Sequence, residues 1–501
     1  ELVYGKCTVV EMTAPEGMVI NKEAHDVGLA YAGQEVSVTE TATSCVNDRQ
    51  KVAVSLEKTI EKNDIFNIGN GDEMKNISFG LFAAEELVSA SGTSIPADGL
   101  IEIISLSENG KAVIKTEIPF GSYYVKELAT DEHYILSDAK YPFTFSYAGQ
   151  DTANVEIAVN DGKAIENKLI YGSVSGKKIT ENGEALGGAV IGLFKADETE
   201  FTKENALMTA TSENDGSFSF EKVPYGTWII REIESPTGFV LSDEEIPVTI
   251  GSVDELVEVE LVNEFITGSI ELTKVDEDYP DNKLTGAVFE VYADKNGDGK
   301  LDDGDELLGE MAELGDGVYQ MSDLRYGKYL IRETKAPEGF LLDTNVYPVS
   351  IEEDGKIYTV ENEAGVGFIN AAQKGSLKIV KTSSDGKVEG FSFRVMGKDY
   401  DQTFKTDANG EILIEGLRIG EYTVSEVSDN ASAGYILPAE KQATVKTDAT
   451  TIVEMHNELR ETPKTGDDFN PALGAGLAAV SVIGAGVLGF VGFKNRKKKE
   501  D

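Results

Sequence analysis

The sequence is poor in the residues that most often serve catalysis and metal binding. Its 501 residues include two cysteines, three histidines and one tryptophan, which leaves little material for a thiol enzyme or a transition-metal site. Basic residues are also few, with 45 Lys and Arg against 89 Asp and Glu and a formal net charge of -44. Because a phosphate backbone is bound by clustered Lys and Arg, this balance argues against nucleic acid as a partner. No pattern indicates catalysis with turnover, so we expect the protein not to be an enzyme.

Long apolar runs are absent except near the C-terminus. Residues 471–493 are uncharged, are dominated by Ala, Gly, Val, Leu and Phe, and are long enough to span a bilayer as a helix. A basic tail follows, which predicts that the tail stays cytoplasmic and that everything upstream lies outside the cell. No apolar signal segment opens the chain, and Glu1 is not an initiator methionine, so we expect a fragment or a processed form.

A pentapeptide precedes the apolar run, and it consists of Thr462, Pro463, Lys464, Thr465 and Gly466. The order of pentapeptide, apolar helix and basic tail resembles the sortase signal of Gram-positive surface proteins. The resemblance implies that a membrane transpeptidase cuts between Thr465 and Gly466 and joins the Thr carbonyl to an amine of the peptidoglycan precursor. The usual first residue is Leu, so the class of sortase stays open. An ordinary membrane anchor is the alternative interpretation.

One signature occurs five times along the chain, and such repeats decide the architecture. A Gly-containing turn leads into an alternating strand that ends in Glu, and a Pro- or Gly-marked loop follows in most copies. The copies are YGKCTVVEMTAPEGMVI (4–20), FGSYYVKELATDEHYIL (120–136), YGTWIIREIESPTGFVL (225–241), YGKYLIRETKAPEGFLL (326–342) and IGEYTVSEVSDNASAGYIL (419–437).

The repeats predict an all-β fold of tandem antiparallel β-sandwich modules, prealbumin-like or immunoglobulin-like, with one C-terminal transmembrane helix. We expect a partial module, the C-terminal half of a fifth, at residues 1–50. Complete modules are expected at 51–171, 172–267, 268–374 and 375–460, and a targeting segment at 461–501.

Each complete module contains a lysine, a glutamate and an asparagine in fixed order. Side chains two apart in a strand share a face, and the neighbours at that spacing are mostly apolar, so all three side chains are expected to point into the core. We call these sets the trios: Lys58–Glu127–Asn167, Lys178–Glu232–Asn263, Lys274–Glu333–Asn370 and Lys381–Glu426–Asn457. In the first of them, Lys62 is an alternative to Lys58.

The trios predict a self-modification reaction. Burial favours the uncharged forms of Lys and Glu, and a neutral amine is a nucleophile. Beside an Asn carboxamide polarised by a protonated Glu, the amine can attack the amide carbon, with the Glu relaying the proton and ammonia leaving. The product is one Lys–Asn isopeptide bond per module. The alternative is a solvated Lys, a surface Glu and a turn Asn, which recurrence in fixed order and register disfavours.

At these residues the chain resembles collagen-adhesin B-type domains, also called SpaA-type or prealbumin-like, of Gram-positive surface proteins and pilins. The resemblance covers nearly all of residues 1–460 and rests on the YGxYxxxE…PxGF signature. It implies Lys–Asn isopeptide bonds with a catalytic acid, here Glu127, Glu232, Glu333 and Glu426. Adhesins and pilins both use this domain, so the resemblance does not identify a ligand.

An acidic loop, DKNGDGKLDDGD at 294–305, has the spacing of an EF-hand calcium loop without flanking helices. A Ca²⁺ site is predicted there, the alternative being an Asp/Asn/Gly hairpin. No other cofactor is required. The candidate positions are Asp294, Asn296, Asp298, Lys300, Asp302 and Asp305.

Cys7 and Cys45 are both expected at core positions of the partial module. The compartment is oxidising, so a disulfide is predicted, with two buried apolar thiols as the alternative.

The function predicted from these features is a cell-wall-anchored stalk of crosslinked modules, extracellular and covalently attached to the wall. Sortase and peptidoglycan are the expected partners, together with a host or extracellular-matrix ligand bound through a region upstream of Glu1. A sortase-polymerised pilin is one alternative, but KYPF (140–143) and VYPV (346–349) match the required YPK-like motif poorly. The stalk of a surface enzyme with an upstream catalytic domain is another.

Overall fold

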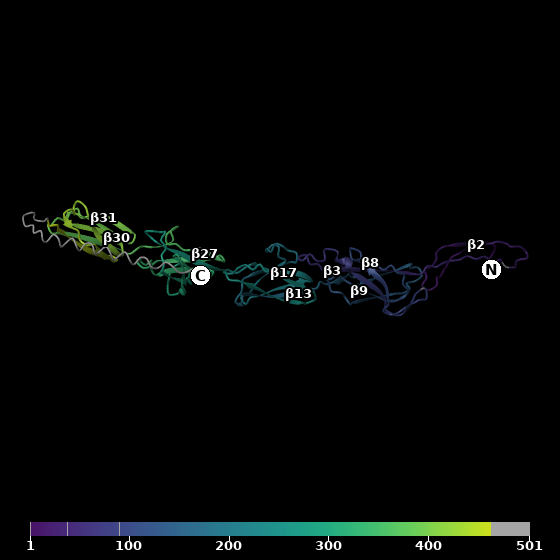
Figure 1. The fold of residues 1–501 in the computed structure, drawn as a ribbon. Coiled ribbons are helices and arrows are strands. Elements are labelled where there is room, and N and C mark those ends of the chain that lie inside the picture. Colours follow the sequence, from purple (N-terminus) through teal and green to yellow (C-terminus); the bar gives the residue numbers. More distant parts are fainter. Residues whose placement is uncertain (1, 38, 90, 462–501) are drawn as a thin grey trace, which may run out of the picture.

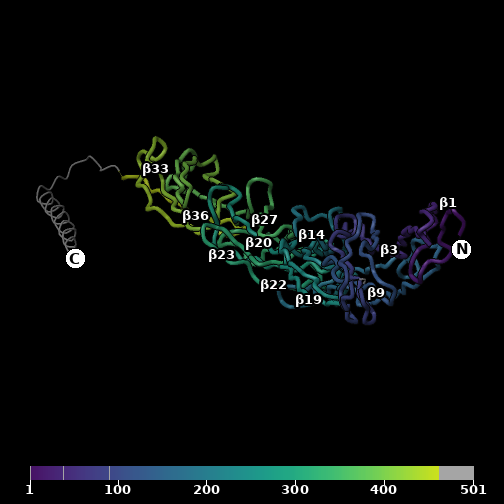
Figure 2. The backbone as a smooth tube through the Cα atoms, turned by 90° about the vertical axis from the view of Figure 1, so that its right-hand side faces the viewer, coloured from purple at the N-terminus to yellow at the C-terminus, as the bar shows by residue number. Residues whose placement is uncertain are grey.

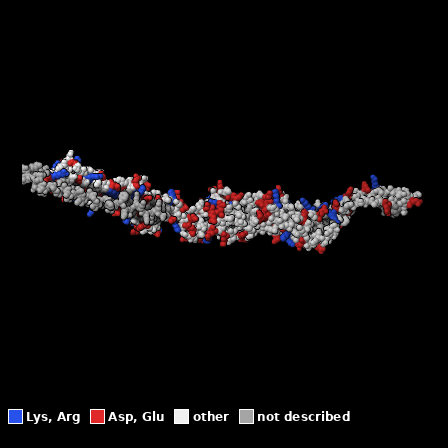
Figure 3. All heavy atoms as spheres, viewed as in Figure 1, with Lys and Arg blue, Asp and Glu red and all other residues white. Residues whose placement is uncertain are grey.

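The computed structural model describes residues 2–37, 39–89 and 91–461, and the predicted pentapeptide, apolar span and basic tail lie outside them. β-rich modules follow one another along an elongated molecule, with the N-terminal residues at one end (Figures 1 and 2). Acidic side chains are spread along the visible face (Figure 3). No helix in the described part of the chain is long and apolar enough to cross a membrane.

The all-β prediction is confirmed, because the described residues form strands with only two short 3-10 helices. The N-terminal segment has two strands, β1 (Gly5–Val9) and β2 (His25–Leu29), which pair with each other. The first complete module contains β3 (Lys51–Ile60), η1 (Glu73–Asn76), β4 (Ser78–Ala83), β5 (Leu87–Val88), β6 (Ser94–Ile95), β7 (Leu100–Ser105), β8 (Lys111–Val113), β9 (Gly121–Ala129), β10 (Lys140–Phe145), β11 (Asn154–Ala158), η2 (Val159–Gly162) and β12 (Ile165–Asn167).

The next two modules repeat this plan. The second contains β13 (Tyr171–Thr180), β14 (Val190–Lys195), β15 (Met208–Thr211), β16 (Ser217–Pro224), β17 (Gly226–Glu234), β18 (Ile246–Ile250) and β19 (Leu256–Asn263). The third contains β20 (Thr267–Asp276), β21 (Val288–Ala293), β22 (Glu306–Glu310), β23 (Ala312–Gly315), β24 (Val318–Arg325), β25 (Gly327–Lys335), β26 (Val346–Ile351), β27 (Lys356–Thr359) and β28 (Phe368–Asn370).

The fourth module closes the described chain. It contains β29 (Lys374–Ser383), β30 (Ser392–Gly397), β31 (Tyr400–Lys405), β32 (Glu411–Arg418), β33 (Gly420–Val427), β34 (Tyr435–Ile436), β35 (Lys441–Val445) and β36 (Thr450–Leu459). The first strands of the last three modules begin at Tyr171, Thr267 and Lys374, each one residue before the module start expected from the sequence.

Each complete module is a two-sheet sandwich. In the second module one sheet has the order β16-β13-β19 and the other β15-β14-β17-β18. Alternate residues of both sheets point inward and form the core, as in β13, where Val174 and Lys178 are buried and Ser173 and Ser175 are only partly covered. Such alternation is what a strand covered on one face requires.

The first and last strands of every complete module pair in parallel, whereas the sequence predicted antiparallel sheets throughout. β13 pairs in parallel with β19, β20 with β28, β29 with β36, and β3 with β12. The first strands of the first and third modules also pair in parallel with β11 and β27, and the other ladders are antiparallel. A chain that enters along the first strand and leaves along the last therefore crosses each module in one direction, which suits a linear array.

Candidate functional site

The parallel register brings the lysine and asparagine of each trio together. Lys274 lies opposite Phe368, and Asp276 lies opposite Asn370. Lys274 and Asp276 share a face of β20, so the Lys274 side chain lies beside that of Asn370. The other modules have the same offset, with Lys58 opposite Ile165, Lys178 opposite Leu261 and Lys381 opposite Met455.

The glutamate comes from the opposite sheet, on β9, β17, β25 or β33. Eleven of the twelve trio side chains belong to residues that are buried, at 0–3% exposure, and Glu426 is half-buried. Burial of three polar groups in an apolar core is costly unless they satisfy one another. Their recurrence in four cores therefore indicates a shared chemical purpose.

The third module has the most compact trio. Lys274 Nζ donates to Asn370 Oδ1 and lies 3.3 Å from Glu333 Oε1. Asn370 Nδ2 donates to both carboxyl oxygens of Glu333 at 3.0 Å. The backbone amide of Asp343 donates to Glu333 Oε2 at 2.8 Å. One carboxyl group thus contacts both the amine and the amide nitrogen.

The second module repeats this arrangement. Lys178 Nζ donates to Asn263 Oδ1 and lies 3.9 Å from Glu232 Oε1. Asn263 Nδ2 donates to Glu232 Oε1 at 2.9 Å, and the amide of Ser242 donates to Glu232 Oε2 at 2.9 Å. The lysine nitrogen, the carboxamide and the carboxyl group are again in contact.

The first module keeps the contact between Glu127 and Asn167, but Lys58 Nζ makes its hydrogen bonds elsewhere and none to Asn167. Asn167 Nδ2 donates to Glu127 Oε1 at 2.8 Å, and Lys58 Nζ lies 3.9 Å from the same oxygen. Lys58 Nζ donates to the carbonyl oxygens of Thr59 and Ile165, and Asn167 Oδ1 has no partner. Lys62, the alternative left open by the sequence, is exposed and donates to Asn70, so Lys58 is the lysine of this trio.

The fourth module departs from the others at its glutamate. Asn457 Nδ2 donates to Glu426 Oε1 at 2.7 Å, but Glu426 Oε2 and Asn457 Oδ1 have no partner, and Lys381 Nζ donates to Thr382 O. Elsewhere the donor to Oε2 is a backbone amide ten residues after the glutamate. Here the loop is longer, and aligning Tyr435 with the aromatic residue of the other copies places Pro438 at the donor position. Proline has no amide hydrogen to donate.

Burial shifts the pKa values of the trio lysines and of two trio glutamates in the directions that favour their uncharged forms. Burial lowers the pKa of Lys274 to about 8 against the opposing charge of Glu333, and it lowers the pKa of Lys58 to about 8. It also lowers the pKa of Lys178 and of Lys381. Burial raises the pKa of Glu232 and of Glu426.

This geometry suits acyl transfer from the asparagine to the lysine. A neutral amine can attack the carboxamide carbon, because the amine already contacts the carboxamide oxygen in two modules. A carboxyl group in contact with both nitrogens can take the proton from the amine and give it to the departing nitrogen. A site that reacts in this way would form one bond once, without turnover.

A variant that cannot form the bond provides a pH test. In Asn370→Ala, Lys274 would remain a buried amine, and burial lowers the pKa of this lysine to about 8 in the unlinked module, against 10.5 in the unfolded chain. Between these values the unfolded state binds more protons, so stability rises with pH through this window and is lowest below about pH 8. Deprotonation of Lys274 raises the free energy of unfolding by at most about 3 kcal/mol over this window.

Urea unfolding near pH 7.5 and near pH 9.5 measures this gain. The matched control is Lys274→Met in the same Asn370→Ala background, which should lack the lysine contribution. If the stability of the two variants depended equally on pH, burial would not be lowering the pKa of Lys274.

The two cysteines differ from expectation. Both are free thiols in the structure; Cys7 is half-buried and Cys45 is exposed, so the prediction of a core position is wrong for Cys45. The reason is local, since residues 2–37 and 39–50 form only the β1–β2 sheet, with no second sheet of their own to cover it. The predicted disulfide is not formed in this arrangement.

The acidic loop is held by its own backbone. Asp294 accepts hydrogen bonds from the amides of Gly297 and Gly299, and Asp305 accepts from those of Lys295 and Asp302. No three carboxylate, His or Cys side chains are grouped to hold a metal ion anywhere in the described ranges, which include all of 294–305. These hydrogen bonds explain the Asp, Asn and Gly residues of the loop as parts of a hairpin turn. Calcium binding stays a prediction.

Chelation distinguishes the two interpretations of this loop. If the loop binds Ca²⁺, excess chelator should lower the melting temperature of the third module, whereas a plain hairpin predicts no change. Scanning calorimetry with and without added Ca²⁺ measures it. A lower melting temperature in chelator, restored by Ca²⁺ but not by Mg²⁺, would establish the calcium site.

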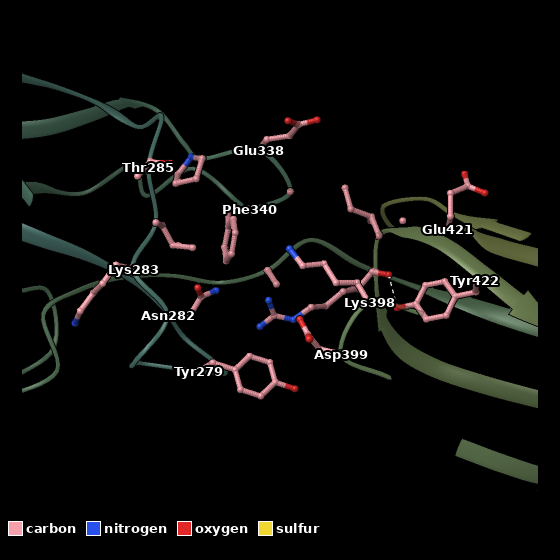
Figure 4. A pocket seen from close by; sticks show the side chains of 17 residues that line it. Tyr279, Asn282, Lys283, Thr285, Glu338, Phe340, Lys398, Asp399, Glu421 and Tyr422 are labelled. Carbon is pink, nitrogen blue, oxygen red and sulfur yellow. Dashed lines mark hydrogen bonds between the residues drawn. The ribbon is translucent and has the colours of Figure 1, made fainter. Parts of the chain in front are cut away.

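The joint between the third and fourth modules is a feature that the sequence did not reveal. Arg418 donates to both oxygens of the buried Asp276 at 2.6 Å and to Asp278 at 2.7 Å, and Lys374 pairs with Asp278 at 3.0 Å. Burial alone would raise the pKa of Asp276, but the hydrogen bonds and charge of Arg418, together with hydrogen bonds from Asp278 and Asn282, outweigh burial and lower that pKa. Figure 4 shows the hollow at this joint, with Tyr279 on one side and Tyr422 on the other.

Four two-sheet sandwiches in series, each with a Lys–Glu–Asn trio between its sheets, define a class of modular β-proteins. The SpaA family of prealbumin-like fold domains matches residues 59–163, 172–264, 268–364 and 375–459. The chain therefore belongs to this family, and the sequence resemblance to SpaA-type domains is confirmed.

Solved structures that the chain matches include pilin subunits. The Bacillus anthracis TIE protein has a TM-score of 0.49 and 19% identity, covering 77% of this chain and 68% of its own. BcpA, the major pilin subunit of Bacillus cereus, has a TM-score of 0.28 and 16% identity over 58% of this chain and 99% of its own. A streptococcal ancillary pilin has a TM-score of 0.22 and 19% identity over 65% of this chain and 99% of its own. No curated protein matches the chain in sequence.

Proposed function

We propose that the protein is a structural stalk of a Gram-positive cell surface, in which each complete module is stabilised by an autocatalytic Lys–Asn isopeptide bond. The observation that supports this most is the parallel register, which places a buried lysine beside a buried asparagine in all four modules. The glutamate that contacts the amide nitrogen in each module is the proton relay.

The position of the bond suits a load-bearing role. In the third module it would join the first strand, β20, to the last strand, β28. Tension that enters along β20 would then pass at Lys274 directly to Asn370 and leave towards the fourth module. The residues between them would carry no load, so the module need not unfold when the stalk is pulled.

The proposal extends to attachment through the C-terminal signal, with sortase as the processing enzyme and peptidoglycan as the acceptor. Residues 462–466 and the apolar and basic segments after them support this from sequence alone. The net charge of -44 suits an exposed surface, since like charge keeps neighbouring chains apart. Adhesion to a host or matrix ligand would belong to a region outside this sequence.

Release of the protein from native cells tests the attachment. We expect detergent alone to leave it in the wall fraction and a wall hydrolase to release it as single chains attached to wall fragments. A ladder of covalent multimers after boiling in detergent would instead assign it to polymerised pilins. Extraction of the intact chain by detergent alone would contradict wall linkage. Thr465→Ala is the matched variant, expected to remain detergent-soluble.

A further inference from the structure

The residue that links one complete module to the next is hydrogen-bonded to both of them. At the joint between the third and fourth modules, Gln373 N donates to Gly339 O at 2.8 Å, and Gln373 O accepts from Ile419 N at 3.1 Å. The Gln373 side chain repeats this bridge, because it donates to Phe340 O at 2.9 Å and accepts from Thr447 Oγ1 at 2.7 Å. The earlier joints have the same pair of backbone bonds at their linking residues, Ile170 and Ile266.

The side chains that meet across the three joints differ in kind. Between the first and second modules apolar side chains pack together, and the ring centroids of Phe66 and Trp228 are 4.8 Å apart. Between the second and third modules the guanidinium of Arg325 lies 3.7 Å from the ring centroid of Phe265. Among the described residues, the joint between the third and fourth modules is the only one of the three that contains ion pairs.

Asp276 is a buried carboxylate of the third module whose counter-ion belongs to the fourth module. It is 0% exposed and ends β20. Within its own module it accepts hydrogen bonds from uncharged donors, the amide of Asp278 at 2.9 Å and Asn282 Nδ2 at 3.3 Å. Its negative charge is balanced by Arg418, which donates to both of its oxygens. Loss of Arg418 would therefore leave a buried charge without a counter-ion in the third module.

The second module has an uncharged residue at the same position. Thr180 is the equivalent of Asp276, since each lies opposite the trio asparagine of its module. Thr180 Oγ1 accepts from the amides of Asn182 and Glu184 at 3.3 and 3.2 Å, so a hydroxyl is enough to hold the turn after this strand. The turn does not require the charge of Asp276, and the contact that uses this charge is the one with the next module.

The surroundings of Arg418 hold its guanidinium in place. Its Cζ lies 4.8 Å from the ring centroid of Tyr279 and 5.9 Å from that of Phe340, both on the third module (Figure 4). Arg418 also donates to Asp278, with which Lys374 pairs at 3.0 Å. Two cations of the fourth module thus face two carboxylates of the third.

We propose that docking of the fourth module stabilises the third module through Arg418, so that the two modules form one mechanical unit of the stalk. Bending at this joint separates Arg418 from Asp276 and leaves the buried carboxylate unpaired, which opposes the movement. The inference goes beyond the proposed function and does not require the trios to react.

Hydrogen exchange of the whole chain, followed by mass spectrometry of its peptides, tests this coupling. In Arg418→Met, amides of β20 and β25 should exchange at least about tenfold faster, although the substitution lies in the fourth module. The matched control is Arg394→Met, because Arg394 belongs to the same module and pairs with Asp401 on the exposed surface. It should leave exchange in the third module unchanged.

A second substitution identifies the group through which Arg418 acts. Asp276→Thr in the Arg418→Met background should restore slow exchange, because it removes the unpaired charge and keeps a hydroxyl for the turn. Unchanged exchange of the third module in Arg418→Met would overturn the proposal, and so would fast exchange that persists in the double variant. The intact mass of each variant shows separately whether the trios have reacted, so a failure of the proposed function is not mistaken for a failure of the joint.

Discussion

Replacing Asn370 by Ala is expected to lower the free energy of unfolding of the third module by about 4–5 kcal/mol. The bond between Lys274 and Asn370 would close a loop of about 100 residues, and a covalent link of that length stabilises by roughly this amount through the lost entropy of the unfolded chain. The variant also leaves Lys274 as a buried amine without its acceptor. Denaturant unfolding of the module measures the change.

The control for this variant is Asn345→Ala in the same module. Asn345 is exposed and hydrogen-bonds only to Asp343, so its replacement should change stability by less than about 0.5 kcal/mol. Trypsin should cut the Asn370→Ala module more readily than either the control or the unchanged protein. Equal stability of the two variants would mean that no covalent link spans β20 and β28.

Replacing Glu333 by Ala is expected to abolish the third bond while leaving both of its partners in place. Glu333 contacts Lys274 and Asn370, so its loss removes the proton relay but neither reacting group. The variant should retain one ammonia that the unchanged protein has lost, and its tryptic digest should lack the peptide that joins Lys274 to Asn370. Mass spectrometry of the intact chain and of the digest gives both readouts.

Glu338→Ala is the matched control, because Glu338 is an exposed carboxylate in the loop that follows β25. It should keep all four bonds. A crosslinked peptide joining Lys274 to Asn263 would contradict the assignment of partners, and a normal bond in Glu333→Ala would remove Glu333 from the mechanism.

Sequence alone predicted the sandwich class and grouped the trios, with Lys58 and Lys62 left as alternatives in the first, because both inferences depend on local periodicity and repeat order. Side-chain parity around Lys274 and Asn263 pointed both into cores, and both are buried. The repeat of Lys, Glu and Asn in one order then grouped them by module, although the residues between them differ in number.

Features that depend on pairing between distant strands could not be predicted in this way. The parallel register of β20 with β28 follows from the path of the whole module, and no local pattern encodes it. Parity also placed Cys45 in a core, but burial requires a covering strand that residues 2–37 and 39–50 do not supply.

Of two other features, one left a signal in the sequence that could have been found. Pro438 stands where the other copies have a residue with a backbone amide, and aligning the loops of the repeats on their aromatic residue exposes the difference. Arg418 occupies the last position of β32, but its partners Asp276 and Asp278 belong to the preceding module. An alignment of the repeats compares equivalent positions within modules, so it cannot show contacts between one module and the next.

The intact mass of the purified chain tests the central claim most directly. If all four trios react, the protein is lighter than its sequence by four molecules of ammonia, one for each of Asn167, Asn263, Asn370 and Asn457. A mass equal to that of the unmodified sequence would contradict the isopeptide mechanism and leave a tandem array of β-sandwiches with buried, unreacted trios.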